Sequence, residues 1–205
     1  MSEAVESDAP SALRAPVLTL PVAEAEAVVA AYERAQTILE YGSGGSTAVA
    51  ASLPGRVVFS VESDANWLAG LAEWFSANPP RARLHLHHAD VGPTGKWGVP
   101  RDARFREAFP AYAMSVWDRP DFVQPDVVLI DGRFRVGCFL AVLFRSVRPV
   151  TVLWDDYVSR RIYHAVERYV RPVGFHGRMA RFEVTPMPVP PSDLGWIVTQ
   201  FAVVK

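Results

Sequence analysis

Segments rich in valine, isoleucine and leucine alternate along the chain with segments whose apolar residues recur at helical spacing. The apolar segments predict strands at residues 37–41, 57–62, 82–88, 126–130 and 151–154. Helical spacing, capping residues and stop signals predict helices at residues 22–34, 46–53, 64–77, 136–147 and 159–169. Continuous apolar strands separated by helices are typical of a parallel sheet covered on both faces. The pattern therefore predicts an α/β fold with a doubly wound, Rossmann-like, mostly parallel sheet.

Two further apolar runs follow the last predicted helix, at residues 179–185 and 195–204. The proline-rich segment TPMPVPPSD lies between them, and no helical pattern separates them. Parallel neighbours need a crossover connection, whereas antiparallel strands do not. We therefore expect these two runs to form a C-terminal antiparallel hairpin that completes a seven-stranded sheet.

Residues 91–124 interrupt the alternation of strands and helices. Glycines, prolines and large aromatic side chains are interleaved there, with room for one helix within residues 101–114. Loops of this length are usually functional or mobile. We interpret residues 91–124 as an inserted, lid-like loop over a substrate; an insertion packed by its own aromatic residues is the alternative.

Length and composition narrow the class of protein. The chain has 205 residues, which suggests one domain because domains usually run to about 100–200 residues; we expect a single domain at 16–205 after a flexible polar segment at 1–15. The formal net charge of −1 gives no electrostatic reason to expect nucleic-acid binding. A single cysteine, Cys138, excludes an internal disulfide. No apolar run is long enough to span a membrane, and no export signal is seen in residues 1–15, so we expect a cytoplasmic protein without a membrane partner.

The segment TILEYGSGGST, residues 37–47, has the order of a cofactor-binding unit. An apolar run ends in Glu40, a glycine-rich turn and a helix start follow, and a second apolar run ends in Glu62, twenty residues after Gly42. Glycine lets the backbone approach a ligand, and an acid at the end of the second strand can accept hydrogen bonds from ribose hydroxyls. This order predicts a site for an adenosine-bearing cofactor, although a tight turn without a cofactor would show the same glycines.

The details of this loop discriminate between cofactors. A dinucleotide loop requires a third glycine where Thr47 stands, and Glu40 would repel a pyrophosphate. S-adenosylmethionine carries an ammonium and a sulfonium instead, and the pattern resembles motif I of the class I S-adenosylmethionine-dependent methyltransferases. The resemblance implies that Glu40 lies near the methionine ammonium. It also implies that Gly42 and Gly44 admit the methionine part and that Glu62 binds the ribose hydroxyls.

Acidic residues lie at or just after the end of every predicted parallel strand. They are Glu40, Glu62, Asp90, Asp131 and the pair Asp155 and Asp156. The carboxyl ends of parallel strands meet at one edge of the sheet, where ligands bind. Like charges gathered there would repel one another unless cations or hydroxyl groups lie among them. The pattern therefore predicts a functional site at that edge.

In the resemblance, the third acid contacts the adenine. Asp90 would accept a hydrogen bond from the adenine amino group, and the backbone N–H of Val91 would reach a ring nitrogen. Asp90 also precedes Gly92 and Pro93, and aspartate is common in turns. A purely structural role in a turn is the alternative for this residue.

The second half of the chain resembles metal-dependent O-methyltransferases of the catechol and macrolide-sugar types. The segments VVLIDGRFR and TVLWDDY place Asp131 24 residues before Asp155. The resemblance implies that Asp131, Asp155 and Asp156 bind magnesium, for which hard oxygen ligands are suited. The ion would lower the pKa of an acceptor hydroxyl, which makes Asp131 and Asp155 the candidate catalytic residues.

Two departures from that pattern leave other roles open. No lysine follows Asp131 closely, where Arg133 and Arg135 stand instead, and Arg148-Pro149-Val150 replaces a Gly-Gly pair before the fifth strand. Asp131 could bind the cofactor ammonium or a backbone N–H, and Asp155 could cap the next helix. Either arginine could hold a carboxylate or phosphate of the substrate, or pair with the nearby acids.

Taken together, these patterns predict an S-adenosylmethionine-dependent methyltransferase that acts on a small molecule, at an oxygen atom if the second resemblance holds. One alternative is a protein of the same fold that binds S-adenosylmethionine or S-adenosylhomocysteine without catalysis. Another is a nicotinamide-dependent oxidoreductase, against which Glu40 and Thr47 argue. The sequence leaves open whether the chain forms a homo-oligomer.

Overall fold

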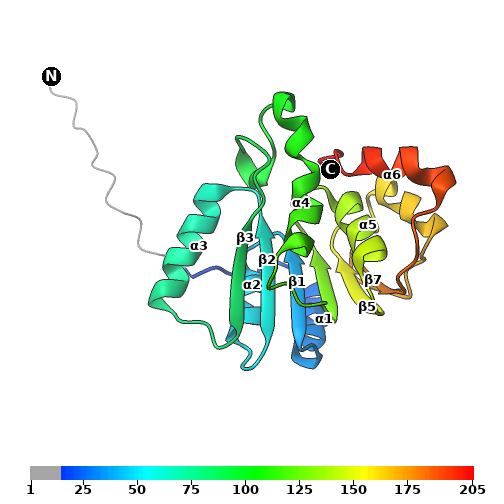
Figure 1. Ribbon diagram of the computed structural model, residues 1–205. Coiled ribbons are helices and arrows are strands. Elements are labelled where there is room, and N and C mark those ends of the chain that lie inside the picture. The colour runs from blue at the N-terminus through cyan, green and yellow to red at the C-terminus, as the bar shows by residue number, and fades with distance from the viewer. Residues whose placement is uncertain (1–14) are drawn as a thin grey trace, which may run out of the picture.

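A single mixed sheet of seven strands runs through the computed structural model, which describes residues 15–205 (Figure 1). The strands lie in the order β3-β2-β1-β4-β5-β7-β6. Their bounds are β1 (Thr37–Tyr41), β2 (Val57–Glu62), β3 (Arg83–His88), β4 (Val127–Ile130), β5 (Val150–Trp154), β6 (Gly174–His176) and β7 (Met179–Val184). The first five pair in parallel, whereas β7 is antiparallel to both β5 and β6. The predicted doubly wound, mostly parallel sheet is confirmed.

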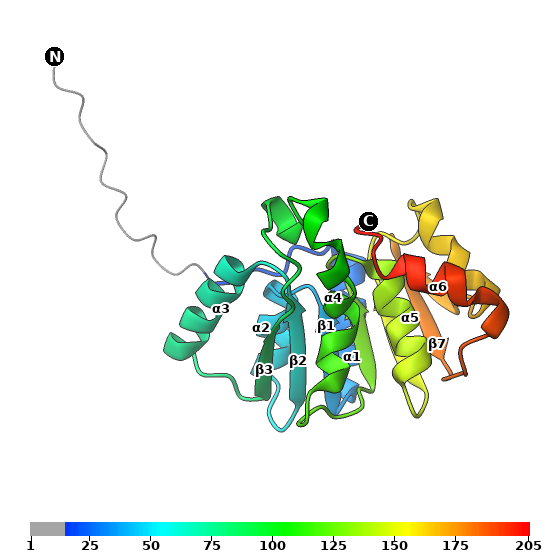
Figure 2. The ribbon, with the colours of Figure 1, turned by 45° about the horizontal axis from the view of Figure 1, so that its top comes forward.

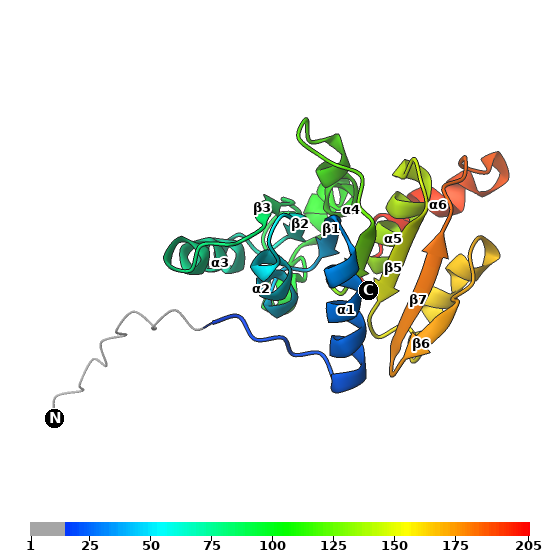
Figure 3. The same cartoon turned by 90° about the horizontal axis from the view of Figure 1, so that it is seen from below.

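Helices cover both faces of this sheet. One face carries α1 (Val22–Arg34), α2 (Gly45–Ser52) and α3 (Ala65–Ala77), and the other carries α4 (Pro110–Met114), α5 (Arg135–Arg145) and α6 (Leu194–Gln200), as Figures 2 and 3 show. Short 3-10 helices lie at Lys96–Gly98, Ala103–Ala108, Ser115–Asp118, Arg161–Arg168 and Pro191–Asp193. The strands are therefore buried on both sides, which explains their continuous apolar sequence.

The starts of α2 and α3 follow from local side-chain hydrogen bonds. Asp64 caps α3 as expected, because its Oδ1 accepts from the backbone N–H groups of Asn66 and Trp67 at 3.0 and 3.1 Å. The helix expected at 46–53 begins one residue earlier, at Gly45, with Gly44 as its capping residue. Thr47 lies one turn inside, where its Oγ1 accepts from the Gly44 N–H at 2.9 Å.

The C-terminal hairpin is present, but one of its strands was wrongly predicted. Residues 195–204, expected to be a strand, form α6 and the coil that follows it, and β7 pairs instead with the short strand β6. Apolar Ile197 is buried on the α5 side of the sheet, and the absence of a side chain at Gly137 in α5 lets Phe201 approach closely. Tertiary packing against α5 has overridden the strand propensity of this valine-rich segment. The expected α-helix at 159–169 is likewise a 3-10 helix.

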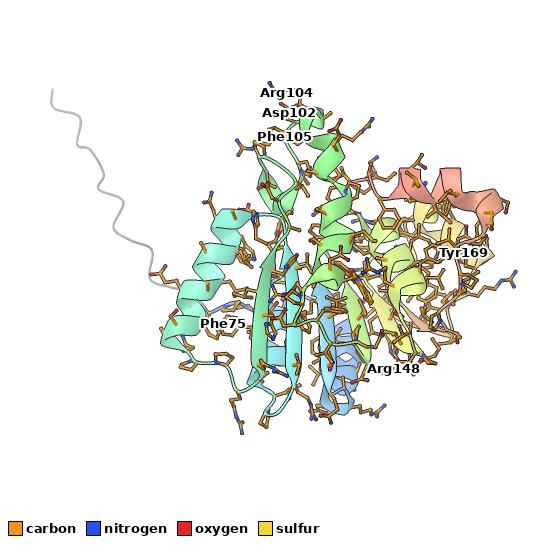
Figure 4. All side chains as sticks on the ribbon, viewed as in Figure 1. Phe75, Asp102, Arg104, Phe105, Arg148 and Tyr169 are labelled. Carbon is orange, nitrogen blue, oxygen red and sulfur yellow. The ribbon has the colours of Figure 1, made fainter. Side chains whose placement is uncertain are left out.

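The inserted segment at 91–124 divides into two parts. Phe109, Tyr112 and Trp117 are buried in the core, and α4 lies beside α5. The part before them projects beyond the carboxyl edge of the sheet, where Phe105 lies close to its tip (Figure 4). Two short helices lie within residues 101–114 in place of the one expected. The second part is core structure, so the interpretation as a lid now concerns only the first part.

Two expectations about the chain as a whole have separate outcomes. Within the described residues, no helix combines the length and the apolar character that crossing a membrane requires. The flexible segment expected at 1–15 falls, apart from Ala15, outside the described residues.

The core on the α5 face yields a stability prediction. Phe139 is fully buried, with its ring centroid 5.2 Å from that of Trp154 and 5.0 Å from that of Phe182. We expect Phe139→Ala to lower the free energy of unfolding by about 3–5 kcal/mol, because it removes buried surface and leaves a cavity. Urea denaturation followed by circular dichroism measures this. Val147→Ala, at a side chain 82% exposed, is the control and should change stability by less than about 0.5 kcal/mol; equal losses would contradict this account of the core.

Candidate functional site

A cavity of about 280 Å³ opens at the carboxyl edge of the sheet, where the loops after β1, β2 and β4 meet. Its lining comprises residues 16–20, 42–46, Glu62, Asp64, Trp67, Trp97, Gly98 and 131–133. Four of the predicted site residues therefore lie together around one space: Gly42, Gly44, Glu62 and Asp131. The carboxyl edge is also where ligands bind in open α/β sheets.

Two glycines let the turns after β1 and β4 approach each other. Gly42 has a φ of +105°, and a Cβ there would lie 2.8 Å from the backbone nitrogen of Gly132. A Cβ on Gly132 would in turn collide with the hydroxyl of Tyr112. The backbone of the protein itself thus requires Gly42. Gly44 differs, because a Cβ there would contact only Trp67, at 4.0 Å, and no protein atom requires a glycine.

Hydroxyl groups beneath the glycine-rich loop hold it in place. Ser60 Oγ on β2 lies 2.8 Å from Ser43 Oγ and 3.0 Å from Thr47 Oγ1. Thr47 in turn accepts from the N–H of Gly44. The loop is thereby tied to the neighbouring strand, and its backbone is fixed before any ligand arrives.

Glu40 lies beneath this loop and does not line the cavity. Its side chain is fully buried, Oε1 accepts a hydrogen bond from Tyr32 of α1 at 2.6 Å, and Oε2 has no partner. Burial raises the pKa of the Glu40 carboxyl, and the hydroxyl groups around it oppose that rise. Any influence of Glu40 on a bound methionine ammonium would therefore act through the loop and not by direct contact.

Glu62 is held rigidly at the edge of the cavity. Oε1 accepts from the backbone N–H groups of Ser63 and Asp64 at 2.7 and 2.9 Å, and Oε2 accepts from that of Ser43 at 3.3 Å. The Ser63 hydroxyl also donates to Oε1, at 3.3 Å, so three donors meet Oε1 and one meets Oε2. Each carboxylate oxygen has two lone pairs, so Oε2 keeps room for one more donor. Glu62 lines the cavity, and the ribose contact implied for it stays a prediction.

Asp90 and Val91 lie away from this cavity. Asp90 Oδ1 accepts from the Gly92 N–H at 2.9 Å, as a turn-forming aspartate does, and Asp90 lines a neighbouring hollow together with Ser63 and Asp64. Asp64 borders both spaces. The side chain of Val91 is fully buried in the core. An adenine contact at Asp90 would require a ligand that extends from one space into the other.

The acids after β4 and β5 are paired with arginines. Arg178, in the turn between β6 and β7, binds both oxygens of Asp155 at 3.0 Å and Oδ1 of Asp156 at 2.9 Å. Arg160 binds Asp156 Oδ2 at 2.7 Å. Asp155 does not cap the following 3-10 helix, because the capping residue is Arg160.

Arg135, at the start of α5, joins the ends of β4 and β5. Its guanidinium is buried and donates to the backbone carbonyls of Gly132, Asp131 and Asp155 at 2.9, 2.8 and 2.6 Å. It also lies 3.1 Å from Asp131 Oδ1 and 3.5 Å from Asp156 Oδ2. A planar fork of five N–H donors suits this arrangement, which a lysine could not reproduce.

This donor set does not fit a magnesium ion. Asp131, Asp155 and Asp156 each hold a guanidinium, and residues 15–205 contain no group of three or more metal-ligating side chains suited to an ion. Burial, with a contribution from Asp155 and Asp156 and against the effect of Arg135, raises the pKa of Asp131 from 3.8 to about 7. The three aspartates are therefore bound by arginines and are not free to ligate an ion.

Three features of this edge of the sheet were missed in the sequence. Residues 16–20 cross the glycine-rich loop so closely that a Cβ on Gly45 would collide with the backbone of Val17. Trp67 donates from Nε1 to the carbonyl of Ser43 at 2.8 Å. Arg178 was missed because the hairpin that carries it was wrongly predicted. Only Trp67 left a signal, as a large aromatic residue in the first turn of a helix capped at the same edge.

Comparison with known proteins shows which solved structures share this architecture. The chain is 49% identical to a methyltransferase-like protein of Silicibacter pomeroyi DSS-3, with a TM-score of 0.88 over 92% of this chain and 98% of that one. The O-methyltransferase TomG of Streptomyces achromogenes, solved in complex with S-adenosylmethionine, is 15% identical, with a TM-score of 0.52 over 83% of this chain and 82% of that one. A methyltransferase of Geobacter sulfurreducens is 11% identical, with a TM-score of 0.51 over 83% and 82%. No family model and no curated protein matches the chain.

The strand order, the glycine-rich loop after β1 and the acid after β2 agree with this likeness. The two distant structures share the fold alone, whereas the Silicibacter protein is related along nearly its whole length. The chain thus belongs to the class I S-adenosylmethionine-dependent methyltransferase family, together with the methyltransferase-like protein of Silicibacter pomeroyi.

Proposed function

We propose that the protein transfers a methyl group from S-adenosylmethionine to an oxygen atom of a small molecule. The observation that carries this proposal is Glu62, a carboxylate fixed by three backbone N–H groups at the edge of the cavity. TomG, which shares the fold, is an O-methyltransferase solved with S-adenosylmethionine, and this motivates the same cofactor and acceptor atom here.

The charges around the cavity favour this cofactor over a dinucleotide. In the part of the chain that the structure describes, the charged side chains that line it are Glu62, Asp64, Asp131 and Arg133. An excess of carboxylates suits the ammonium and sulfonium of S-adenosylmethionine and opposes a pyrophosphate. The bound cofactor would supply an electrophilic methyl group, and the chain would contribute mainly orientation.

Within this proposal the two candidate catalytic aspartates have different roles. Asp131 lines the cavity, and we assign to it the contact with the acceptor hydroxyl or the cofactor ammonium. Asp155 is buried, does not line the cavity and binds Arg178 through both oxygens, so we assign it a positioning role. Neither role needs a divalent ion.

The first test removes the charge of Glu62. Glu62→Gln keeps the shape of the side chain and an acceptor for Ser63 and Asp64, but it weakens any hydrogen bonds to ribose hydroxyls. Hydrogen bonds to a charged group contribute about 1.5–3 kcal/mol, so we expect S-adenosylhomocysteine to bind about ten to a hundred times more weakly. Isothermal titration calorimetry measures the dissociation constant.

Glu183→Gln is the matched control for this change. Glu183 lies on β7 opposite Thr151, towards the other end of β5 from the cavity, and pairs with Arg181. Its substitution should leave the dissociation constant unchanged. Equal affinities of the Glu62 variant and the wild type for S-adenosylhomocysteine would contradict the ribose contact. Tighter binding of NADH than of S-adenosylhomocysteine would favour the oxidoreductase alternative.

The second test concerns divalent ions. Arginines bind the aspartates after β4 and β5. We therefore expect that neither 5 mM magnesium nor EDTA shifts the thermal unfolding midpoint. Neither should change the turnover of hydroxylated acceptors by more than about twofold. A manganese titration followed by electron paramagnetic resonance should show no saturable site. A stoichiometric manganese site would contradict the assignment of these residues.

A screen of hydroxylated acceptors, with detection of S-adenosylhomocysteine as the product, separates catalysis from binding alone. Turnover of any acceptor supports the enzyme. Tight binding of S-adenosylhomocysteine without turnover would instead favour the protein that retains the cofactor without transferring its methyl group.

A further inference from the structure

Among the described residues, 15–205, Arg133 is the one cationic side chain that lines the cavity. It follows the turn at Gly132, is half-buried, and donates from Nε to the carbonyl of Trp97 at 2.7 Å. This bond fixes one edge of the guanidinium. The two terminal nitrogen atoms at the other side remain available to a ligand.

The pairing of Arg133 differs from that of the arginines next to it. Arg135, Arg160 and Arg178 each lie within 4.0 Å of an aspartate carboxylate, whereas Arg133 has no carboxylate within that distance in residues 15–205. A partly buried cation without a counter-charge is costly. Burial lowers the pKa of the Arg133 guanidinium, and the positive charges of Arg135 and Arg160 add to this effect while Tyr112 and Tyr163 oppose it.

The charged side chains at the ends of β4 and β5 also leave Arg133 without a counter-charge. Four arginines, at positions 133, 135, 160 and 178, face three aspartates, at 131, 155 and 156. Arg135, Arg160 and Arg178 bind all three aspartates, so none of the three is left for Arg133. A bound anion would supply the counter-charge that Arg133 lacks among the described residues.

We propose that the methyl acceptor carries a carboxylate or phosphate group that binds to Arg133. This rests on the proposed function and names the class of its substrate. A planar guanidinium binds either group through two parallel hydrogen bonds. Trp97 also lines the cavity: its backbone carbonyl accepts the bond from Arg133 Nε, and its side chain is 75% exposed. An aromatic or apolar body next to the anionic group of the acceptor would contact this ring.

The methionine carboxylate of the cofactor is the other source of an anion in this cavity. If the methionine carboxylate binds to Arg133, the loss of Arg133 weakens the binding of S-adenosylhomocysteine. If the anionic group of the acceptor binds there, the loss of Arg133 leaves that binding unchanged. Our proposal requires that Arg133 contributes little to the affinity for S-adenosylhomocysteine and strongly to the affinity for a separate anion.

The experiment uses benzoate and phenyl phosphate as anionic probes and benzyl alcohol as the neutral probe. Saturation-transfer NMR titrations give each dissociation constant for the wild type, with and without saturating S-adenosylhomocysteine. Arg133→Met removes the guanidinium and keeps an apolar stem. Arg83→Met, at the amino end of β3 on the opposite edge of the sheet, is the matched control.

We expect at least one of the anions to bind the wild type and the Arg83 variant at least ten times more tightly than benzyl alcohol. In the Arg133 variant this preference should disappear, while the dissociation constant of S-adenosylhomocysteine changes less than threefold. Equal binding of anions and alcohol by the wild type, or anion binding unchanged in the Arg133 variant, would overturn the proposal. A tenfold loss of S-adenosylhomocysteine affinity in that variant would also overturn it, because Arg133 would then serve the cofactor.

The arm without S-adenosylhomocysteine separates this inference from the proposed function. If the wild type binds no S-adenosylhomocysteine at all, the proposed function fails. If anion binding without S-adenosylhomocysteine still depends on Arg133, the anion site stands. If it does not depend on Arg133, the anion site fails as well.

Discussion

The buried guanidinium of Arg135 is the contact on which the carboxyl edge of the sheet depends. It binds three backbone carbonyls at the ends of β4 and β5 as well as the carboxylate of Asp131. These carbonyls lie where the strands have ended and the ladder no longer supplies partners. Arg135 thus holds the turn that carries Asp131, Gly132 and Arg133, together with the Tyr112 hydroxyl, which accepts from the Arg133 N–H.

The shape of this turn determines the rest of the site. Gly132 meets Gly42 backbone to backbone, which brings the loop after β4 against the loop after β1. The hydroxyl groups of Ser43, Thr47 and Ser60 hold the second loop from below. Both sides of the cavity are thus fixed by interactions within the protein. Such preorganisation suits a direct displacement, in which orientation supplies much of the rate.

The two halves of the edge differ in charge because arginines are distributed unevenly. The carboxylates of Glu62 and Asp64 accept hydrogen bonds from backbone N–H groups, so the part of the edge at the end of β2 carries negative charge. Beyond β4, arginines outnumber the aspartates, and the network leaves Arg133 without an acid. The family resemblance of the second half, which had implied magnesium, does not extend to these arginine partners, and the chemistry of the edge changes accordingly.

The order of strands and helices, the glycine-rich loop and the acids at the strand ends could all be predicted from the sequence, because hydrophobic periodicity and capping are local properties. The sequence by itself thus determined the α/β class and the edge that carries the site. Local pattern failed at residues 195–204, where packing on α5 selects a helix, and at Asp155 and Asp156, whose partner Arg178 comes from a distant turn. Only the tertiary structure decided which acids face a ligand and which face an arginine, since that depends on charges brought together from strands and turns far apart in the chain.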